Sequence, residues 1–265
     1  MKPSISAFYL KIDGLILDEK GMLYAFNFNS KINYCFSYFN DPIKSLQYNR
    51  LGSKVLVSDK KGRIYLTDFQ SHNLLNERQN STVQWFNSET QYIVCDSINN
   101  KLDVIDILSG NSPVLSFNYD FNLNKKCPVS VFENYIASGH DNGRVFIFDI
   151  RKNLPISCKP FSSGRITALQ YNKSGVTLYC GSSDNSFEVI ETNNFKTKFK
   201  IKDIWEKSNY PPNKKGIKSI AVSNQAIVVG GYSPEIHIWT AVRSKGTIIS
   251  KSTSSTIDLR NLFVD

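Results

Sequence analysis

Residues 129–149 carry the pattern that decides the fold: VSVF over 129–132, YIASG over 135–139, HDNG over 140–143 and RVFIFD over 144–149. Three short runs of alternating or β-branched residues are separated by two gaps, which is typical of consecutive β-strands. The Asn142-Gly143 pair supplies the positive-φ residues that a tight hairpin requires. The stretch predicts three antiparallel strands, followed by a weaker fourth strand.

The same four-strand module recurs along the chain. Its other copies lie at 6–26, 43–68, 83–106, 166–191 and 217–239. The spacing of the modules can be measured between the ends of their third strands, at Phe26, Thr67, Ile105, Phe148, Ile190 and Trp239. Consecutive ends are 41, 38, 43, 42 and 49 residues apart, near the ~40–45-residue period of a propeller blade. A β-sandwich has no fixed four-strand module, so the sequence predicts an all-β propeller of about six four-stranded blades.

Residues 137–149, ASGHDNGRVFIFD, resemble the core motif of the WD-repeat family, with Phe148 where the family has Trp. The sixth module ends similarly at Ile238-Trp239, and the resemblance extends over about residues 4–250. It implies a propeller that works as an assembly platform. The family's Gly-His pair between blades is absent, and Gly139-His140 lies in a hairpin instead. We therefore expect the family's His–Ser–Asp–Trp hydrogen-bond network to be intact in none of the blades.

The sequence leaves the closure of the ring open. Six modules fit within residues 1–250, the predicted propeller domain, and 251–265 form a C-terminal tail. Ile257 and Leu259 alternate as in a strand, so the tail is expected to add a closing strand or to bind a partner. A closed six-bladed ring, an open ring and a seven-bladed ring all fit. A partner strand or blade would complete the open ring, as a resemblance to six-bladed nuclear-pore and coat-type propellers implies.

Composition bounds the cell compartment and the partners. The net charge of +9 comes from 24 Lys and 8 Arg against 23 acidic residues. Nucleic-acid interfaces favour the planar Arg fork, so a Lys-rich chain points only weakly to nucleic acid. The sequence has neither a secretory signal segment nor an apolar run that could span a membrane. Its five cysteines form no C-x-x-C pair, which predicts buried, reduced thiols in a nuclear or cytoplasmic protein.

No catalytic constellation is visible in the sequence. The three histidines, His72, His140 and His237, share no local motif with a Cys, Ser or carboxylate, and no phosphate-binding glycine loop is present. Acids recur in the hairpins at Asp18, Asp59, Asp96, Asp141 and Asp184. Such turn residues bond their own backbone, which we favour over a ring of cation ligands. We expect no enzyme activity, no cofactor and no metal.

Candidate partner contacts lie in three places. The connection at 203–216 is the longest, and it carries Trp205, Tyr210, Lys214 and Lys215. Trp and Tyr are enriched among interface anchors, although both could instead fold back onto their own blade. His140 is a further candidate because it lies at a hairpin. Arg151 ends the sequence FDIR (148–151), which resembles the WDxR box by which some WD-repeat proteins dock onto a ubiquitin-ligase adaptor. An intra-blade salt bridge is the simpler interpretation.

The fourth strands are predicted to be outer edges with charged outward faces. In the fifth module Lys196, Lys198, Lys200 and Lys202 alternate with other residues, which places all four on one face of a strand. Charges of this kind protect an edge from unwanted pairing, and a basic stripe for acidic partners is the alternative.

These patterns predict a non-catalytic protein–protein interaction scaffold whose partners are other subunits of a multiprotein complex. The alternatives are a nucleic-acid-associated propeller that uses its basic surface, and a ubiquitin-ligase substrate adaptor that uses residues 148–151.

Overall fold

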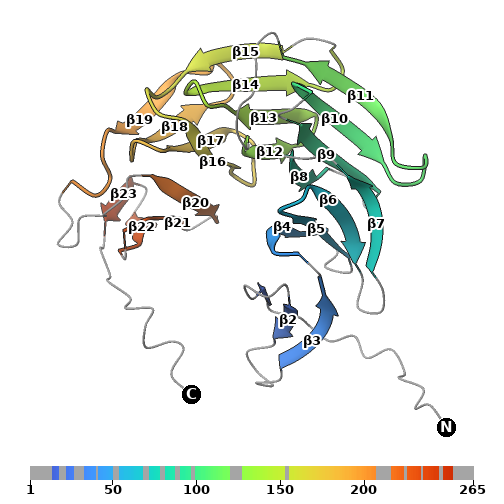
Figure 1. Cartoon of the computed structure of the whole chain (residues 1–265). Coiled ribbons are helices and arrows are strands. Elements are labelled where there is room, and N and C mark those ends of the chain that lie inside the picture. The colour runs from blue at the N-terminus through green and yellow to red at the C-terminus, as the bar shows by residue number, and fades with distance from the viewer. Residues whose placement is uncertain are drawn as a thin grey trace.

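The chain builds its regular structure from antiparallel sheets (Figure 1). The computed structural model describes residues 14–17, 22–26, 33–39, 41–49, 54–67, 72–77, 81–86, 90–96, 99–119, 127–152, 155–206, 216–223, 226–233, 235–244 and 247–252. These residues form 23 strands in six sheets. They contain no helix long and apolar enough to cross a membrane.

Each sheet is one blade, and its strands follow one another in chain order. Blade one holds β1 (Gly14–Leu17), β2 (Met22–Phe26) and β3 (Asn33–Tyr38). Blade two holds β4 (Ile43–Tyr48), β5 (Val55–Asp59), β6 (Arg63–Thr67) and β7 (His72–Glu77), and blade three holds β8 (Ser81–Trp85), β9 (Gln91–Asp96), β10 (Lys101–Asp106) and β11 (Ser112–Asn118). Blade four holds β12 (Val129–Phe132), β13 (Tyr135–Gly139), β14 (Arg144–Asp149) and β15 (Pro155–Pro160). Blade five holds β16 (Ile166–Tyr171), β17 (Thr177–Ser182), β18 (Phe187–Glu191) and β19 (Thr197–Ile201), and blade six holds β20 (Ile217–Val222), β21 (Ala226–Gly231), β22 (His237–Ser244) and β23 (Thr247–Ser252).

This arrangement confirms the predicted four-strand module, but among the described residues five blades are four-stranded and not about six. Five blades have four strands, whereas blade one has three among the described residues. The first strand predicted for it, at residues 6–10, lies outside those residues, and no seventh sheet occurs among them. Strand β23 continues to Ser252, two residues past the predicted domain boundary. The rest of the tail, 253–265, also lies outside the described part of the chain.

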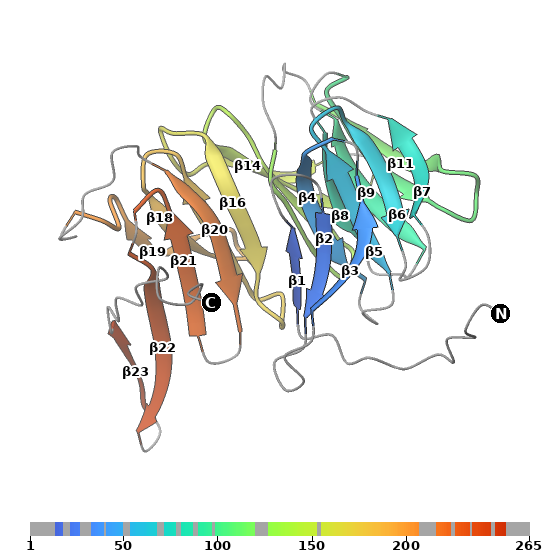
Figure 2. The same cartoon turned by 60° about the horizontal axis from the view of Figure 1, so that its bottom comes forward.

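The blades follow one another around an arc. Strands β4, β8, β12, β16 and β20 lie on the inside of the arc, and β7, β11, β15 and β19 lie on the outside (Figure 1). Figure 2 shows the strands of blade six side by side, with β23 outermost. The fourth strands are therefore outer edges, as predicted. Blades one and six lie at the two ends of the arc, and no strand pairing joins them in the described part of the chain.

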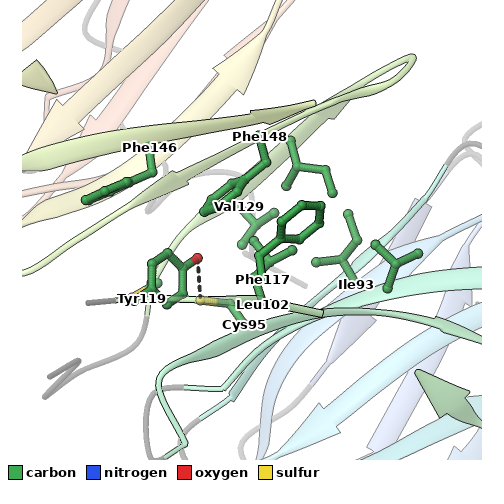
Figure 3. Close-up of a cluster of buried hydrophobic side chains, with 11 residues drawn as sticks. Ile93, Cys95, Leu102, Phe117, Tyr119, Val129, Phe146 and Phe148 are labelled. Atoms are coloured by element: carbon green, nitrogen blue, oxygen red, sulfur yellow. Dashed lines mark hydrogen bonds between the residues drawn. The ribbon is translucent and has the colours of Figure 1, made fainter. Parts of the chain in front are cut away.

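The core lies between neighbouring blades. Between blades three and four, Phe148 is fully buried, and its ring lies 4.9 Å from that of Phe117 (Figure 3). Because the central strands of a blade are covered on both faces, their sequences are nearly continuous runs of apolar residues. Burial of one large apolar side chain contributes about 1.5–3 kcal/mol. Phe148 therefore supplies the apolar burial at the position where the WD-repeat motif has Trp.

Free thiols belong mainly to this core. Cys95, Cys127 and Cys180 are buried thiols outside any disulfide, which confirms the prediction for these three residues, whereas the Cys158 thiol is exposed. The side chain of Cys35 is outside the described part.

Candidate interaction surface

One side of the arc carries the turns between second and third strands together with the connections between blades, and we call it the hairpin face. Backbone hydrogen bonds join each turn to a neighbouring connection. Phe161 N donates to Gly143 O at 2.9 Å, and Ile204 N donates to Asn185 O at 3.2 Å. Tyr232 N donates to Gly216 O at 3.3 Å in blade six. Short turns and connections therefore form one rigid, hydrogen-bonded rim.

In blades two to five the turn between the second and third strands contains one left-handed residue shortly before the third strand. These residues are Gly62 (φ 90°), Asn100 (φ 53°), Gly143 (φ 72°) and Asn185 (φ 70°). In the turn between β13 and β14 only Gly143 has a positive φ, so the prediction that Asn142 shares it was wrong. A Cβ at Gly143 would lie 1.9 Å from Ser162 O. This position needs glycine both for its backbone conformation and for the close approach of the connection.

The turn acids mostly bond their own backbone, as predicted. Asp59 Oδ1 accepts from Arg63 N, Asp96 Oδ1 from Asn99 N and Asp184 Oδ1 from Ser186 N. Asp141 does not, because the amide oxygen of Asn142 accepts the bond from Arg144 N instead. Asp18 lies outside the described residues. No group of three His, Cys, Asp or Glu side chains in the described part could hold a metal ion.

Asp184 joins blade five to the connection that precedes it. Its Oδ2 accepts hydrogen bonds from Ser162 Oγ (2.7 Å), Ser163 Oγ (2.9 Å) and Gly164 N (3.1 Å), and its Oδ1 accepts from Ser182. Burial alone would raise the pKa of Asp184, but the bonds from Ser182 and Ser162 lower it well below its usual value. The carboxylate is therefore ionised and occupied by donors at both oxygens.

His140 lies in the core and not on the surface, which corrects its prediction as a partner contact. The residue is 1% exposed, and Nε2 lies 2.8 Å from Ser138 Oγ, which accepts a hydrogen bond from the Tyr119 hydroxyl at 3.0 Å. Cys127 Sγ lies 3.6 Å from Nδ1. Burial lowers the pKa of His140 to about 3, so the imidazole is neutral near pH 7. A buried polar network of Tyr119, Ser138, His140 and Cys127 thus joins blades three and four.

Trp205 folds back and is buried, which was the alternative to its prediction as an exposed interface anchor. It is 2% exposed and packs between blades five and six. Its ring lies where a side chain at Gly231 would be, 2.2 Å from the Cβ position, and Nε1 donates to Glu235 O at 3.4 Å. Its role in the described structure is to seal the junction between two blades. Tyr210, Lys214 and Lys215 lie outside the described residues.

Arg151 forms the intra-blade salt bridge that was the simpler interpretation. Its Nε and Nη2 donate to the two oxygens of Asp149 at 2.8 and 2.7 Å, and the guanidinium carbon lies 5.8 Å from the Tyr135 ring centre. The hydrogen bonds from Arg151 lower the pKa of Asp149 to about 2. The Arg151 side chain is still 59% exposed.

The outer edge of blade five is basic, but part of its charge is neutralised. Lys200 bonds to Glu188 and to Phe161 O, and Lys198 lies 3.7 Å from Glu191. A bulge at the β18–β19 pairing interrupts the strict alternation that was predicted for the lysines. The charged edge that was predicted for all fourth strands is absent from β11 of blade three, where uncharged residues such as Ser112, Pro113 and Val114 are exposed.

Sequence reasoning missed an exposed aromatic and cation pair on the hairpin face. Tyr232 is 44% exposed, and Lys218 Nζ lies 4.2 Å from its ring centre. Gly216, the last residue of the long connection, lies next to this ring, 3.6 Å from its Cβ position. A bulge after Ile217 in β20 displaces Lys218 from the strand register. The sequence over 217–222, IKSIAV, breaks the alternation of apolar and polar residues, and this break was the signal that could have indicated the bulge.

Two comparisons with known proteins gave no match, and one gave a clear match. No family model and no curated protein matches the chain. A solved structure described as "Crystal Structure of Mitotic Checkpoint Complex" contains a similar chain, with a TM-score of 0.63 and 18% identity. The match covers 96% of this chain and 74% of that chain. At this identity the likeness concerns the fold alone, and together with the blades described above it establishes that the chain is a β-propeller.

Proposed function

We propose that the chain is a non-catalytic scaffold for protein–protein interaction and a subunit of a larger multiprotein complex. The observation that carries the proposal is that polar groups of the turns between second and third strands bond to neighbouring parts of the same chain. His140 is buried and neutral, and Asp184 is saturated by donors from its own blade and the adjoining connection. These groups hold blades and turns together, as a rigid platform requires. The similar chain in a mitotic checkpoint complex supports this proposal.

The partner contact that we propose is the part of the hairpin face around Tyr232 and Lys218. The tyrosine presents a large amphipathic surface on a hydrogen-bonded turn, so ordering it costs little conformational entropy. Gly216, the last residue of the long connection, lies beside the Tyr232 ring. The sequence of the connection at 207–215 adds Tyr210, Lys214 and Lys215, so the proposed partner segment is acidic with an apolar anchor.

Replacement of Tyr232 tests this assignment. We expect Tyr232→Ala in the full-length tagged chain to lower recovery of co-purifying subunits by about fivefold or more, because buried interface aromatics commonly contribute over 1 kcal/mol. Phe199→Ala removes an aromatic that is 50% exposed on β19 and serves as the matched control. Recovery is measured by quantitative mass spectrometry. Equal recovery from both variants would contradict the assignment.

Nucleic-acid binding is the second candidate, and the exposed lysines of the blade-five edge favour it. Lys196 and Lys202 are exposed in addition to Lys198 and Lys200. Their Lys-only composition and the ion pairs to Glu188 and Glu191 reduce the charge available to phosphate.

A further inference from the structure

One buried asparagine holds both ends of the long connection between blades five and six. Asn185, in the turn between β17 and β18, is 1% exposed. Its Oδ1 accepts a hydrogen bond from Gly216 N at 2.6 Å, and its Nδ2 donates to Asp203 Oδ1 at 3.1 Å. A backbone N–H can only donate and a carboxylate can only accept, so these two bonds fix the orientation of the amide. Asn185 thus joins the start of the connection to its end.

The turn does not need this side chain for its own structure. Asn185 has a positive φ, and Asn100 and Gly143 occupy the same place in blades three and four. In blades three, four and five the backbone carbonyl of this residue accepts a hydrogen bond from the connection that follows, from the N–H groups of Tyr119, Phe161 and Ile204. Gly143 shows that a residue without a side chain completes both the turn and this bond. The amide of Asn185 therefore serves the two ends of the connection and not the turn.

Two routes lead from this amide to Tyr232 on the hairpin face. At the end of the connection, Gly216 O accepts from Tyr232 N at 3.3 Å, and the Cβ position of the glycine lies 3.6 Å from the tyrosine ring. At the start, Asp203 Oδ1 also accepts from Trp205 N at 3.0 Å. The Trp205 ring packs against Gly231, the residue before the tyrosine. Both routes act on the backbone that carries the exposed tyrosine.

We propose that Asn185 is a positioning residue for the partner contact at Tyr232 and Lys218, so that blades five and six present one preformed surface. The inference rests on the proposed function and deepens it, because it assigns the order of that contact to a residue of the neighbouring blade. A contact that is ordered before binding costs less conformational entropy when the partner binds. The partner that fits is an acidic segment with an apolar anchor that lies across the junction of the two blades.

Amide hydrogen exchange in the free full-length chain tests the positioning role. Asn185→Gly keeps the left-handed backbone and removes both side-chain bonds, so we expect the Tyr232 amide to exchange at least about tenfold faster. Asn100→Gly, at the same place in blade three, is the matched control and should leave Tyr232 exchange unchanged. An unchanged Tyr232 rate in Asn185→Gly would overturn the inference. An equal acceleration at Ile136, which is fully buried in blade four, would also overturn it, because the effect would then be global.

A swapped pair provides the rescue. Asn185→Asp alone sets two carboxylates against each other, and the addition of Asp203→Asn restores a donor opposite an acceptor. We expect the single variant to accelerate Tyr232 exchange and the double variant to return it to within about threefold of the native rate. An accelerated rate in the double variant that equals that of the single variant would overturn the role of the amide.

Recovery of co-purifying subunits separates this inference from the proposed function. We expect Asn185→Gly to lower recovery by about threefold or more, with Tyr232→Ala lower still, because a disordered contact binds more weakly. Full recovery from Asn185→Gly beside a loss in Tyr232→Ala would overturn the inference alone. Full recovery from Tyr232→Ala, together with faster exchange in Asn185→Gly, would confirm the positioning of Tyr232 and contradict the partner contact.

Discussion

At the scale of single residues, polar and amphipathic side chains at the junctions help to hold the blades together. His140 and Trp205 are buried, Asp184 is half-buried, and each contacts a neighbouring connection or blade. Their residue types are polar or amphipathic, and from sequence alone such types in turns suggest exposure. Their burial depends on close backbone approach at Gly231 and on neighbours such as Tyr119, which lie far away in sequence.

The buried His140 makes stability depend on pH. Its folded pKa of about 3 lies below the unfolded value of 6.5, so the unfolded state binds the proton first as pH falls. Stability is fully present above about pH 6.5 and decreases below it, by about 2 kcal/mol at pH 5. We expect His140→Gln to lose less stability than the native chain between pH 7.5 and 5. Urea unfolding at both pH values measures this, and identical losses in the two proteins would exclude His140 as the source.

Asp184 is expected to contribute more to stability than the neighbouring blade's turn acid. Asp184→Ala removes a charged acceptor that Ser162, Ser163 and Gly164 share, and it should cost about 2–4 kcal/mol in urea unfolding. Asp141→Ala is the matched control, because Asp141 Oδ1 has no hydrogen-bond partner, and it should cost well under half as much. A similar cost for both would contradict the role of the Asp184 cluster.

At the scale of elements, the strands and their order could be predicted because alternation and turn residues are local signals. The runs at 129–149 and 166–191 coincide with β12–β14 and β16–β18. The bulges were not predicted, although the shift after Ile166 and Ile217 leaves a visible break in alternation. The sequence could not decide whether Trp205 is buried or exposed. The space beside Gly231 that holds its ring forms only where two blades pack together.

The long connection between blades five and six is expected to be dispensable for folding. Both of its ends are fixed, because Trp205 is buried and Gly216 N donates to Asn185 Oδ1 at 2.6 Å. We expect replacement of residues 207–215 by a Gly-Ser linker of equal length to leave Tm nearly unchanged and to reduce partner recovery to background. Full recovery with the linker would exclude the connection from the interface, and a large loss of Tm would show a structural role.

At the scale of the whole molecule, the described apolar clusters show that blades three to five each pack against two neighbouring blades. The apolar clusters join blades two to six in sequential pairs, and blades two to four each contain a central strand that is almost entirely buried. Such nearest-neighbour packing yields a rigid body whose turns and connections form large exposed faces. These faces are where sequence can vary without loss of the fold, so they are the natural place for recognition.

The central claim is that the chain binds proteins, and affinity purification of the full-length chain tests it most directly. The tagged chain is purified from its own cells at about 0.15 M and about 0.5 M salt, with and without nuclease, beside RNA binding by the pure protein over the same salt range. We predict stoichiometric protein subunits that survive nuclease and the higher salt, and RNA binding that is weak. Loss of every co-purifying protein on nuclease treatment, together with tight RNA binding that falls steeply with salt, would contradict the account.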